Sequence, residues 1–186
     1  MDVTITFLEQ TERRASTFAP PPVPQLAILR AEDPPAHFYR YLYDLVGERY
    51  HWLTRKNLSD EALLEIIAAP ETHIYVLYYK GAPAGFCEID KHDADAVCIK
   101  LFGLAPHAYG QGLGRYFFSQ CVDLAWQTGP SRVVLETCTL DHPAALPLYQ
   151  KLGFTPYATR RGVVDLPEEA LQSPANEPTP ADPSSM

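Results

Sequence analysis

The sequence predicts an α+β fold, a mixed α/β arrangement in which a partly antiparallel sheet of about six to seven strands is flanked by about four helices. Two observations predict it. Apolar runs near residues 72–80, 83–91 and 95–104 are separated only by short turns, which indicates an antiparallel meander. A strand, a helix and further strands then follow up to residue 161, and the helix at 112–127 has clear 3.6-residue periodicity.

The chain begins with a strand, a linker and a second strand. Apolar residues alternate with threonines at 3–7, residues 10–24 are polar and then proline-rich, and residues 26–30 are apolar again. We expect an N-terminal strand and linker over 1–24, the main domain over 25–165 and a disordered tail over 166–186. Because only one strand follows Phe154, either the first strand or a partner in a homodimer must complete the sheet.

Three further helices are expected. The first starts after Asp33-Pro34-Pro35, and its apolar face is Phe38, Leu42, Leu45 and Val46. The second is capped by Ser59, and its buried residues are Leu63, Leu64, Ile66 and Ile67. The last opens at Asp141-His142-Pro143 and ends at Gly153.

Composition and charge exclude several classes of protein. The formal net charge of -8 argues against a protein that coats nucleic acid, which needs a basic surface. No apolar run approaches the roughly 20 residues that span a bilayer. The four cysteines (Cys87, Cys98, Cys121 and Cys138) lie in apolar runs without C-x-x-C spacing, which predicts free thiols, no metal site and a cytoplasmic location.

A glycine-rich loop carries most of the functional information. Gly110, Gly112 and Gly114 stand between a strand end and a helix, where a ligand can approach the backbone and unpaired N–H groups favour an anion. The G-x-G-x-G spacing fits neither the phosphate loop of NTPases nor the dinucleotide fingerprint G-x-G-x-x-G. On spacing alone, a turn without a ligand remains the alternative.

Two segments together resemble the GNAT superfamily of N-acetyltransferases. The loop from Pro106 to Gly114 resembles the acyl-CoA motif Q/R-x-x-G-x-G/A, and residues 145–154 resemble the segment A-x-x-L-Y-x-x-x-G-F. The resemblance covers roughly residues 25–160. Phe102-Gly103-Leu104 and residues 137–143 are similar to a bacterial subgroup of this family.

The resemblance implies an enzyme that transfers an acetyl group from acetyl-CoA directly to the primary amine of a small molecule. Tyr149 would be the general acid, because the matching family tyrosine reaches the CoA sulfur. Tyr109 replaces the usual Gln or Arg, and His142 replaces an Asn that contacts CoA in many members. The residues expected to bind acetyl-CoA are Phe102, Gly103, Leu104, Tyr109, Gly110, Gln111, Gly112, Leu113, Gly114, Arg115 and His142.

The remaining candidates are for the general base and for the residues that bind the acceptor amine. Cys98 stands where many relatives carry a glutamate base, so Glu88 on the adjacent strand is the candidate, with a solvated carboxylate as the alternative. The residues expected to bind the amine are Tyr50, His51, Trp52 and Arg55, through cation–π contacts, with packing as the alternative. A CoA-binding sensor without catalysis and a protein or peptide N-acetyltransferase are the competing functions.

Overall fold

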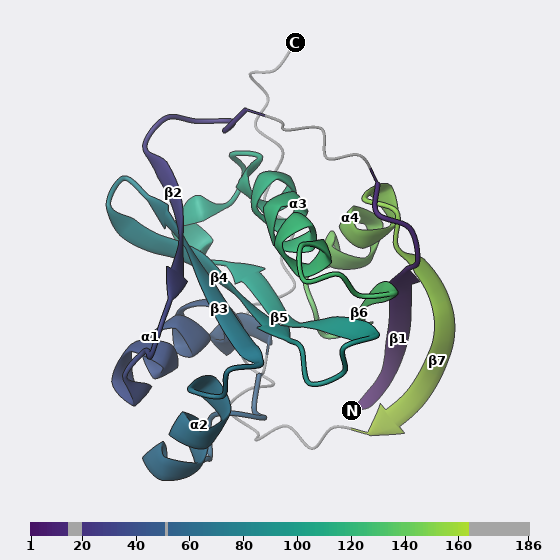
Figure 1. The fold of residues 1–186 in the computed structure, drawn as a ribbon, viewed down its shortest axis with the longest axis horizontal. Coiled ribbons are helices and arrows are strands. Elements are labelled where there is room, and N and C mark those ends of the chain that lie inside the picture. Colours follow the sequence, from purple (N-terminus) through teal and green to yellow (C-terminus); the bar gives the residue numbers. More distant parts are fainter. Residues whose placement is uncertain (15–19, 51, 164–186) are drawn as a thin grey trace.

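The computed structural model describes residues 1–14, 20–50 and 52–163. Its described part has the predicted α+β fold (Figure 1). The strands are β1 (Asp2–Gln10), β2 (Leu26–Ala31), β3 (Thr72–Tyr79), β4 (Ala82–Asp90), β5 (Ala96–Leu104), β6 (Arg132–Cys138) and β7 (Thr155–Val163). The α-helices are α1 (Ala36–Gly47), α2 (Asp60–Ile67), α3 (Leu113–Trp126) and α4 (Ala145–Lys151), with short 3-10 turns η1 (Glu48–Tyr50) and η2 (Pro106–Ala108).

The strands form one seven-stranded sheet in the order β2-β3-β4-β5-β6-β1-β7. The predicted antiparallel meander is confirmed as β3, β4 and β5, and among the described strands only β5 and β6 pair in parallel. The first strand completes the sheet, because β1 pairs antiparallel with both β6 and β7 (Figure 1). The N-terminal strand therefore belongs to the same sheet as the main domain.

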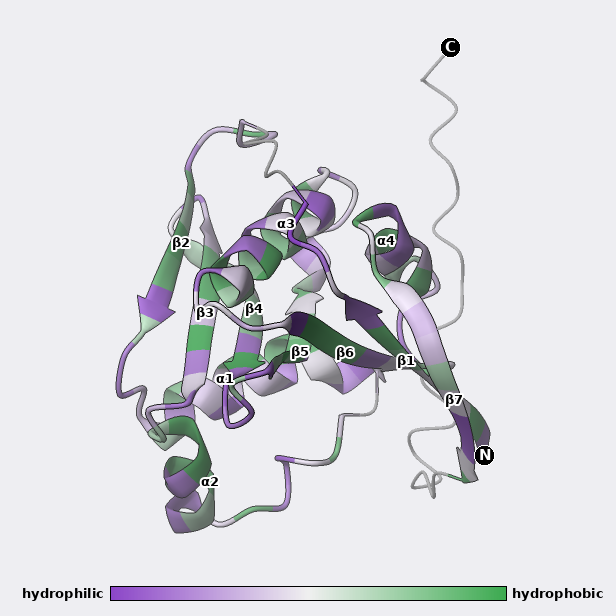
Figure 2. Cartoon of the chain, turned by 45° about the vertical axis from the view of Figure 1, so that its right-hand side comes forward, coloured by the Kyte–Doolittle hydropathy of each residue, from purple (hydrophilic) through white to green (hydrophobic). Residues whose placement is uncertain are grey.

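Helices cover the two faces of the sheet and bury two apolar clusters. The helices α3 and α4 lie on one face, over a cluster that includes Leu113, Phe117 and Phe118. The helices α1 and α2 lie on the other face, over a cluster that includes Leu42, Leu63 and Phe86. Apolar and polar residues alternate along α2 and α3 in Figure 2, as helices with one buried face require. None of the described helices is long and apolar enough to cross a membrane.

The helix α1 buries a face that is rotated from the predicted one. Leu42 and Val46 are buried as predicted, and Tyr39 and Tyr43 are buried too, whereas the predicted Phe38 and Leu45 are only partly buried. Tyrosine has a large apolar ring and a polar tip, so it serves in a core wherever the hydroxyl finds a partner. The Tyr39 hydroxyl donates to the buried Glu88, which explains the rotation.

Two smaller predictions about helices are also corrected. Ser59 caps α2 as expected, accepting a hydrogen bond from the Ala62 N–H at 3.2 Å, but Leu64 is 39% exposed rather than buried. The helix α4 begins at Ala145 and not at Asp141. Pro147 therefore lies in the first turn of α4, where its missing N–H has no intrahelical partner to lose.

Candidate active site

The strands β5 and β6 part from each other after a short paired stretch. Their parallel pairing runs from Ala96 opposite Arg132 to Ile99 opposite Leu135, while β5 continues to Leu104 and β6 to Cys138. On its other side β5 remains paired with β4 up to Leu104. The end of β5 therefore turns backbone N–H and C=O groups toward a gap in the sheet, where a ligand in extended form can pair with them.

A β-bulge at Lys100 marks the point of divergence. Leu101 lies opposite Glu88 and Ile99 lies opposite the next residue of β4, so Lys100 is the extra residue. Leu101 packs into the α1 side of the sheet, whereas Ile99 and Phe102 both contribute to the α3 side. Bulges bend a strand and redirect its side chains, which is what the end of β5 shows.

The gap between β5 and β6 opens into a cavity of about 940 Å³, within the size range of sites for small ligands. The predicted site residues that line it are Tyr50, Trp52, Arg55, Phe102, Gly103, Leu104, Tyr109, Gly110, Gly114, Arg115, His142 and Tyr149. Gln111, Gly112, Leu113 and Glu88 are not among its lining residues, and His51 lies outside the described residues. Sequence reasoning missed Lys100, Glu136 and Asp141, which also line the cavity.

The glycine loop presents the start of α3 to this cavity. Gly112 is the N-cap with φ of 73°, a left-handed conformation that side-chain-bearing residues rarely adopt. Leu113 is buried and anchors the first turn in the core. The N–H groups of that first turn have no partner within the helix, and such groups can donate hydrogen bonds to an anion.

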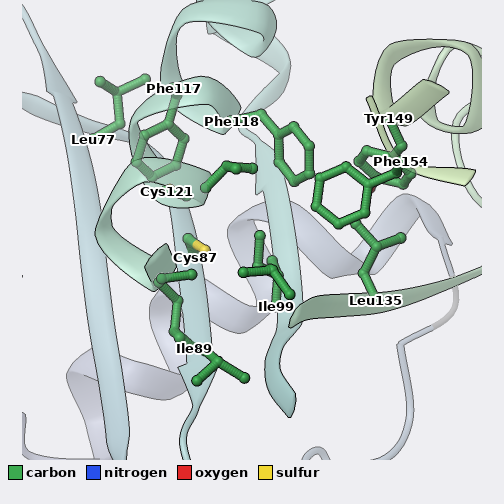
Figure 3. Packing of buried hydrophobic residues seen from close by; sticks show 14 of the residues in the cluster. Leu77, Cys87, Ile89, Ile99, Phe117, Phe118, Cys121, Leu135, Tyr149 and Phe154 are labelled. Carbon is green, nitrogen blue, oxygen red and sulfur yellow. The ribbon is translucent and has the colours of Figure 1, made fainter. Parts of the chain in front are cut away.

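Tyr149 lies in the cavity wall on α4, with its ring in the core. The ring is 4.7 Å from that of Phe118, measured between centroids, and only 8% of the residue is exposed. Figure 3 shows it beside Phe154 and Phe118. Burial, and then the nearby Asp141 carboxylate, raise the pKa of Tyr149 above its ordinary value. The phenol therefore keeps its proton at neutral pH.

The two departures from the family pattern, Tyr109 and His142, lie close together. Their ring centroids are 6.0 Å apart, and Tyr50 joins both: its hydroxyl is 3.0 Å from the Tyr109 hydroxyl and its ring is 6.2 Å from His142. The His142 Nδ1 accepts a hydrogen bond from the Ala144 N–H at 3.1 Å. A neutral His142 thus carries its proton on Nε2 and is a hydrogen-bond donor toward other groups.

Glu88 lies behind the cavity wall. Its carboxylate is 1% exposed, accepts a hydrogen bond from the Tyr39 hydroxyl at 2.5 Å and forms an ion pair with Arg55 at 2.6 Å. Burial, and then the Glu88 charge, raise the pKa of Tyr39, so its hydroxyl remains a donor. Both carboxylate oxygens are engaged, and this arrangement does not present Glu88 to a substrate as a free base.

All four cysteines are free thiols, as predicted. Burial raises the pKa of Cys98 to about 11 and raises the pKa of the fully buried Cys121. Cys138 lines the cavity, and burial followed by the Asp141 charge raises its pKa also. Because the thiolate is the nucleophilic form of cysteine, these three positions do not favour an acyl-cysteine.

A family model and several solved structures are similar to this chain. A family model described as "Acetyltransferase (GNAT) family" matches residues 24–154. No curated protein sequence matches the chain. Solved structures share the fold at low identity, and the chain spans 50% to 60% of the length of the first ones it matches.

Three of these structures are similar along most of the present chain. A GCN5-related N-acetyltransferase from Sphaerobacter thermophilus has 19% identity and a TM-score of 0.57, over 86% of this chain and 51% of its own. A tandem GNAT protein from the clavulanic acid biosynthesis pathway has 14% identity and a TM-score of 0.61, over 87% and 55%. An aminoglycoside acetyltransferase from an uncultured soil metagenomic sample has 14% identity and a TM-score of 0.57, over 69% and 88%. With the family model matching most of the sequence, the chain belongs to the GNAT acetyltransferase family.

Proposed function

We propose that this protein is an N-acetyltransferase that transfers an acetyl group from acetyl-CoA to the primary amine of a small molecule. One observation carries the proposal. A single cavity is lined by the unpaired edge of β5, by the glycine loop at the start of α3 and by Tyr149. These are an extended hydrogen-bonding edge, an anion site and a buried phenol, which together suit a thioester on a long phosphorylated arm.

The residues present fit acetyl-CoA as the acetyl donor. The first turn of α3 offers N–H groups for the pyrophosphate, and apart from its own chain neighbours Gly110 has no atom within 4 Å of the place where a Cβ would stand. Arg115 belongs to this first turn, lines the cavity and adds a positive charge. The backbone of Phe102 to Leu104 would pair with the pantetheine arm and polarise the thioester carbonyl.

Transfer would be direct. The amine nitrogen attacks the carbonyl carbon, the C–S bond breaks, and the departing sulfur takes the Tyr149 proton, which solvent later replaces. The raised thiol pKa values of Cys98 and Cys138 support a route without an acyl-enzyme.

The attacking amine must lose a proton during the reaction. Of the two carboxylates in the cavity wall, Asp141 is already held by the Thr137 hydroxyl at 2.6 Å and the Cys138 N–H at 2.9 Å. Glu136 is exposed on β6 and is therefore the carboxylate that can accept the amine proton. In this proposal Glu88 has a different role, which is to hold Arg55 in place.

Calorimetry with acetyl-CoA, followed by a thiol-release assay across a panel of amines, tests the proposal. We expect acetyl-CoA to bind and at least one small amine to stimulate release of free CoA. Binding without release for any amine would instead support a CoA-binding sensor. Release only with peptide amines would support a protein or peptide N-acetyltransferase.

A further inference from the structure

Arg55 is a charged group in the cavity wall that acetyl-CoA binding does not explain. It follows η1 in the segment before α2, next to Trp52, Leu53 and Thr54, which also line the cavity. This segment lies apart in the chain from the glycine loop and α4, where the donor site is proposed. Arg55 is not among the residues proposed to contact acetyl-CoA, so it is available to the acceptor.

The guanidinium of Arg55 is fixed from behind. Its Nη2 donates to Glu88 Oε1 at 2.6 Å, and Glu88 Oε2 accepts from the Tyr39 hydroxyl at 2.5 Å. The Arg55 backbone N–H donates to the Tyr43 hydroxyl at 3.2 Å. Two tyrosines of α1 and one buried carboxylate thus hold both ends of this residue. A side chain that is positioned in this way loses little conformational entropy when it binds a ligand.

The hydrogen bonds of Arg55 are incomplete. A guanidinium has five N–H donors, and Glu88 accepts from only one nitrogen. The Nε of Arg55 is a buried nitrogen without a hydrogen-bond partner, and it is the only buried side-chain polar atom of that kind in the described part of the chain. The Arg55 side chain is 17% exposed and lines the cavity, so the donors of its guanidinium that Glu88 does not use are available to an acceptor oxygen there.

We propose that the acceptor amine carries a carboxylate and that Arg55 binds this carboxylate. This inference rests on the proposed acetyltransferase function and names the substrate class, an amino acid or a related amino-carboxylate. The planar guanidinium matches the two oxygens of a carboxylate, and such a charge-assisted pair is both strong and directional. The aromatic and apolar neighbours Trp52 and Leu53 would contact the rest of the acceptor.

Matched pairs of amines test the inference. Each natural amino acid, together with β-alanine and γ-aminobutyrate, is compared with its own carboxamide, which keeps the size and loses the charge. We expect kcat/KM for the preferred acid to exceed that of its amide by roughly 10- to 100-fold, the range expected for hydrogen bonds to a charged group. Equal turnover of an acid and its amide would overturn the inference and leave the acetyltransferase function standing.

Arg55 itself is tested by substitution. Arg55→Gln should remove the preference for the acid mainly through KM, and Arg55→Lys should recover part of it. The dissociation constant for acetyl-CoA should stay within about two-fold of the unmodified protein. Lys100→Gln, which removes another cation from the cavity wall, is the matched control and should keep the preference.

Two measurements separate this inference from folding defects and from failure of the proposed function. Arg55→Gln leaves Glu88 buried without its cation and should therefore weaken the fold. The double variant Arg55→Gln/Glu88→Gln should regain the native melting curve, measured by circular dichroism, and should still lack the preference for the acid over its amide. Calorimetry in the presence of CoA measures acceptor binding without turnover. If no amino-carboxylate binds more tightly than its amide, the inference is wrong; if acetyl-CoA itself does not bind, the proposed function is wrong.

Discussion

Replacing Tyr149 by Phe removes one oxygen atom from the cavity wall and leaves the aromatic ring in the core. The ring packs 4.7 Å from Phe118 between centroids, and this contact does not involve the hydroxyl. We therefore expect the free energy of unfolding of the Tyr149→Phe variant to lie within roughly 1 kcal/mol of that of the unmodified protein. The chemical step should suffer much more than the fold.

The size of the kinetic effect follows from the role of the phenol. A positioned general acid contributes roughly 10²- to 10⁴-fold to a rate, so kcat should fall by that factor in the variant. The dissociation constant for acetyl-CoA should change little, because the backbone of β5 and the first turn of α3 make the proposed contacts with it. Steady-state release of CoA and calorimetry measure the two quantities separately.

The pH profile gives a second readout. Burial, and then Asp141, raise the pKa of Tyr149 above its ordinary value near 10, so the protonated acid is present at any pH below that value. Loss of activity through ionisation of Tyr149 should therefore not occur below about pH 10. Tyr157→Phe, a change at a 50% exposed tyrosine on β7, is the matched control and should leave kcat unchanged. An unaltered kcat in Tyr149→Phe would refute the assignment of Tyr149 as the acid.

Two further predictions concern stability. Burial, with help from two nearby cations, lowers the pKa of His73 to about 4, so the unfolded chain binds a proton more readily than the folded one. The free energy of unfolding should therefore fall as pH drops from about 6.5 to about 4. In the His73→Gln variant, the free energy of unfolding from chemical denaturation should change less with pH over that window. A Cβ at Gly103 would collide with Val46 of α1, so Gly103→Ala should lower the free energy of unfolding by roughly 1–3 kcal/mol. The control is Gly162→Ala, where the added atom meets only ordinary contacts and the free energy of unfolding should change far less. Equal effects in both variants would contradict this packing argument.

Much of the fold could be predicted from the sequence because its signals are local. The meander, the cap at Ser59 and the glycine loop before α3 depend on neighbours within a few residues, and the structure has them as expected. The face of α1 could not be predicted in this way. Its choice of Tyr39 depends on Glu88, which is 49 positions away in the chain.

The candidate site also contains residues that the sequence predicted and one whose surroundings it could not predict. Motif matching selected the glycine loop and Tyr149, and both line the cavity. Glu88 is predicted as a base because Cys98 stands where many relatives carry a glutamate and Glu88 is a carboxylate on the adjacent strand. The environment of that carboxylate depends on two distant residues, Arg55 and Tyr39, and no pattern within β4 reveals them.

The cavity depends on a strand that lies outside the family match. The family model covers residues 24–154, yet β1 pairs with β6 from Ile5 opposite Cys138 to Gln10 opposite Val133. Past Leu135, β6 no longer pairs with β5, so β1 is the neighbour that keeps the end of β6 extended. In the same way β4 keeps the end of β5 extended as far as Leu104. Each wall of the opening is thus supported by its outer neighbour, and this is why two strands can part inside a sheet and still present ordered backbone edges to a ligand.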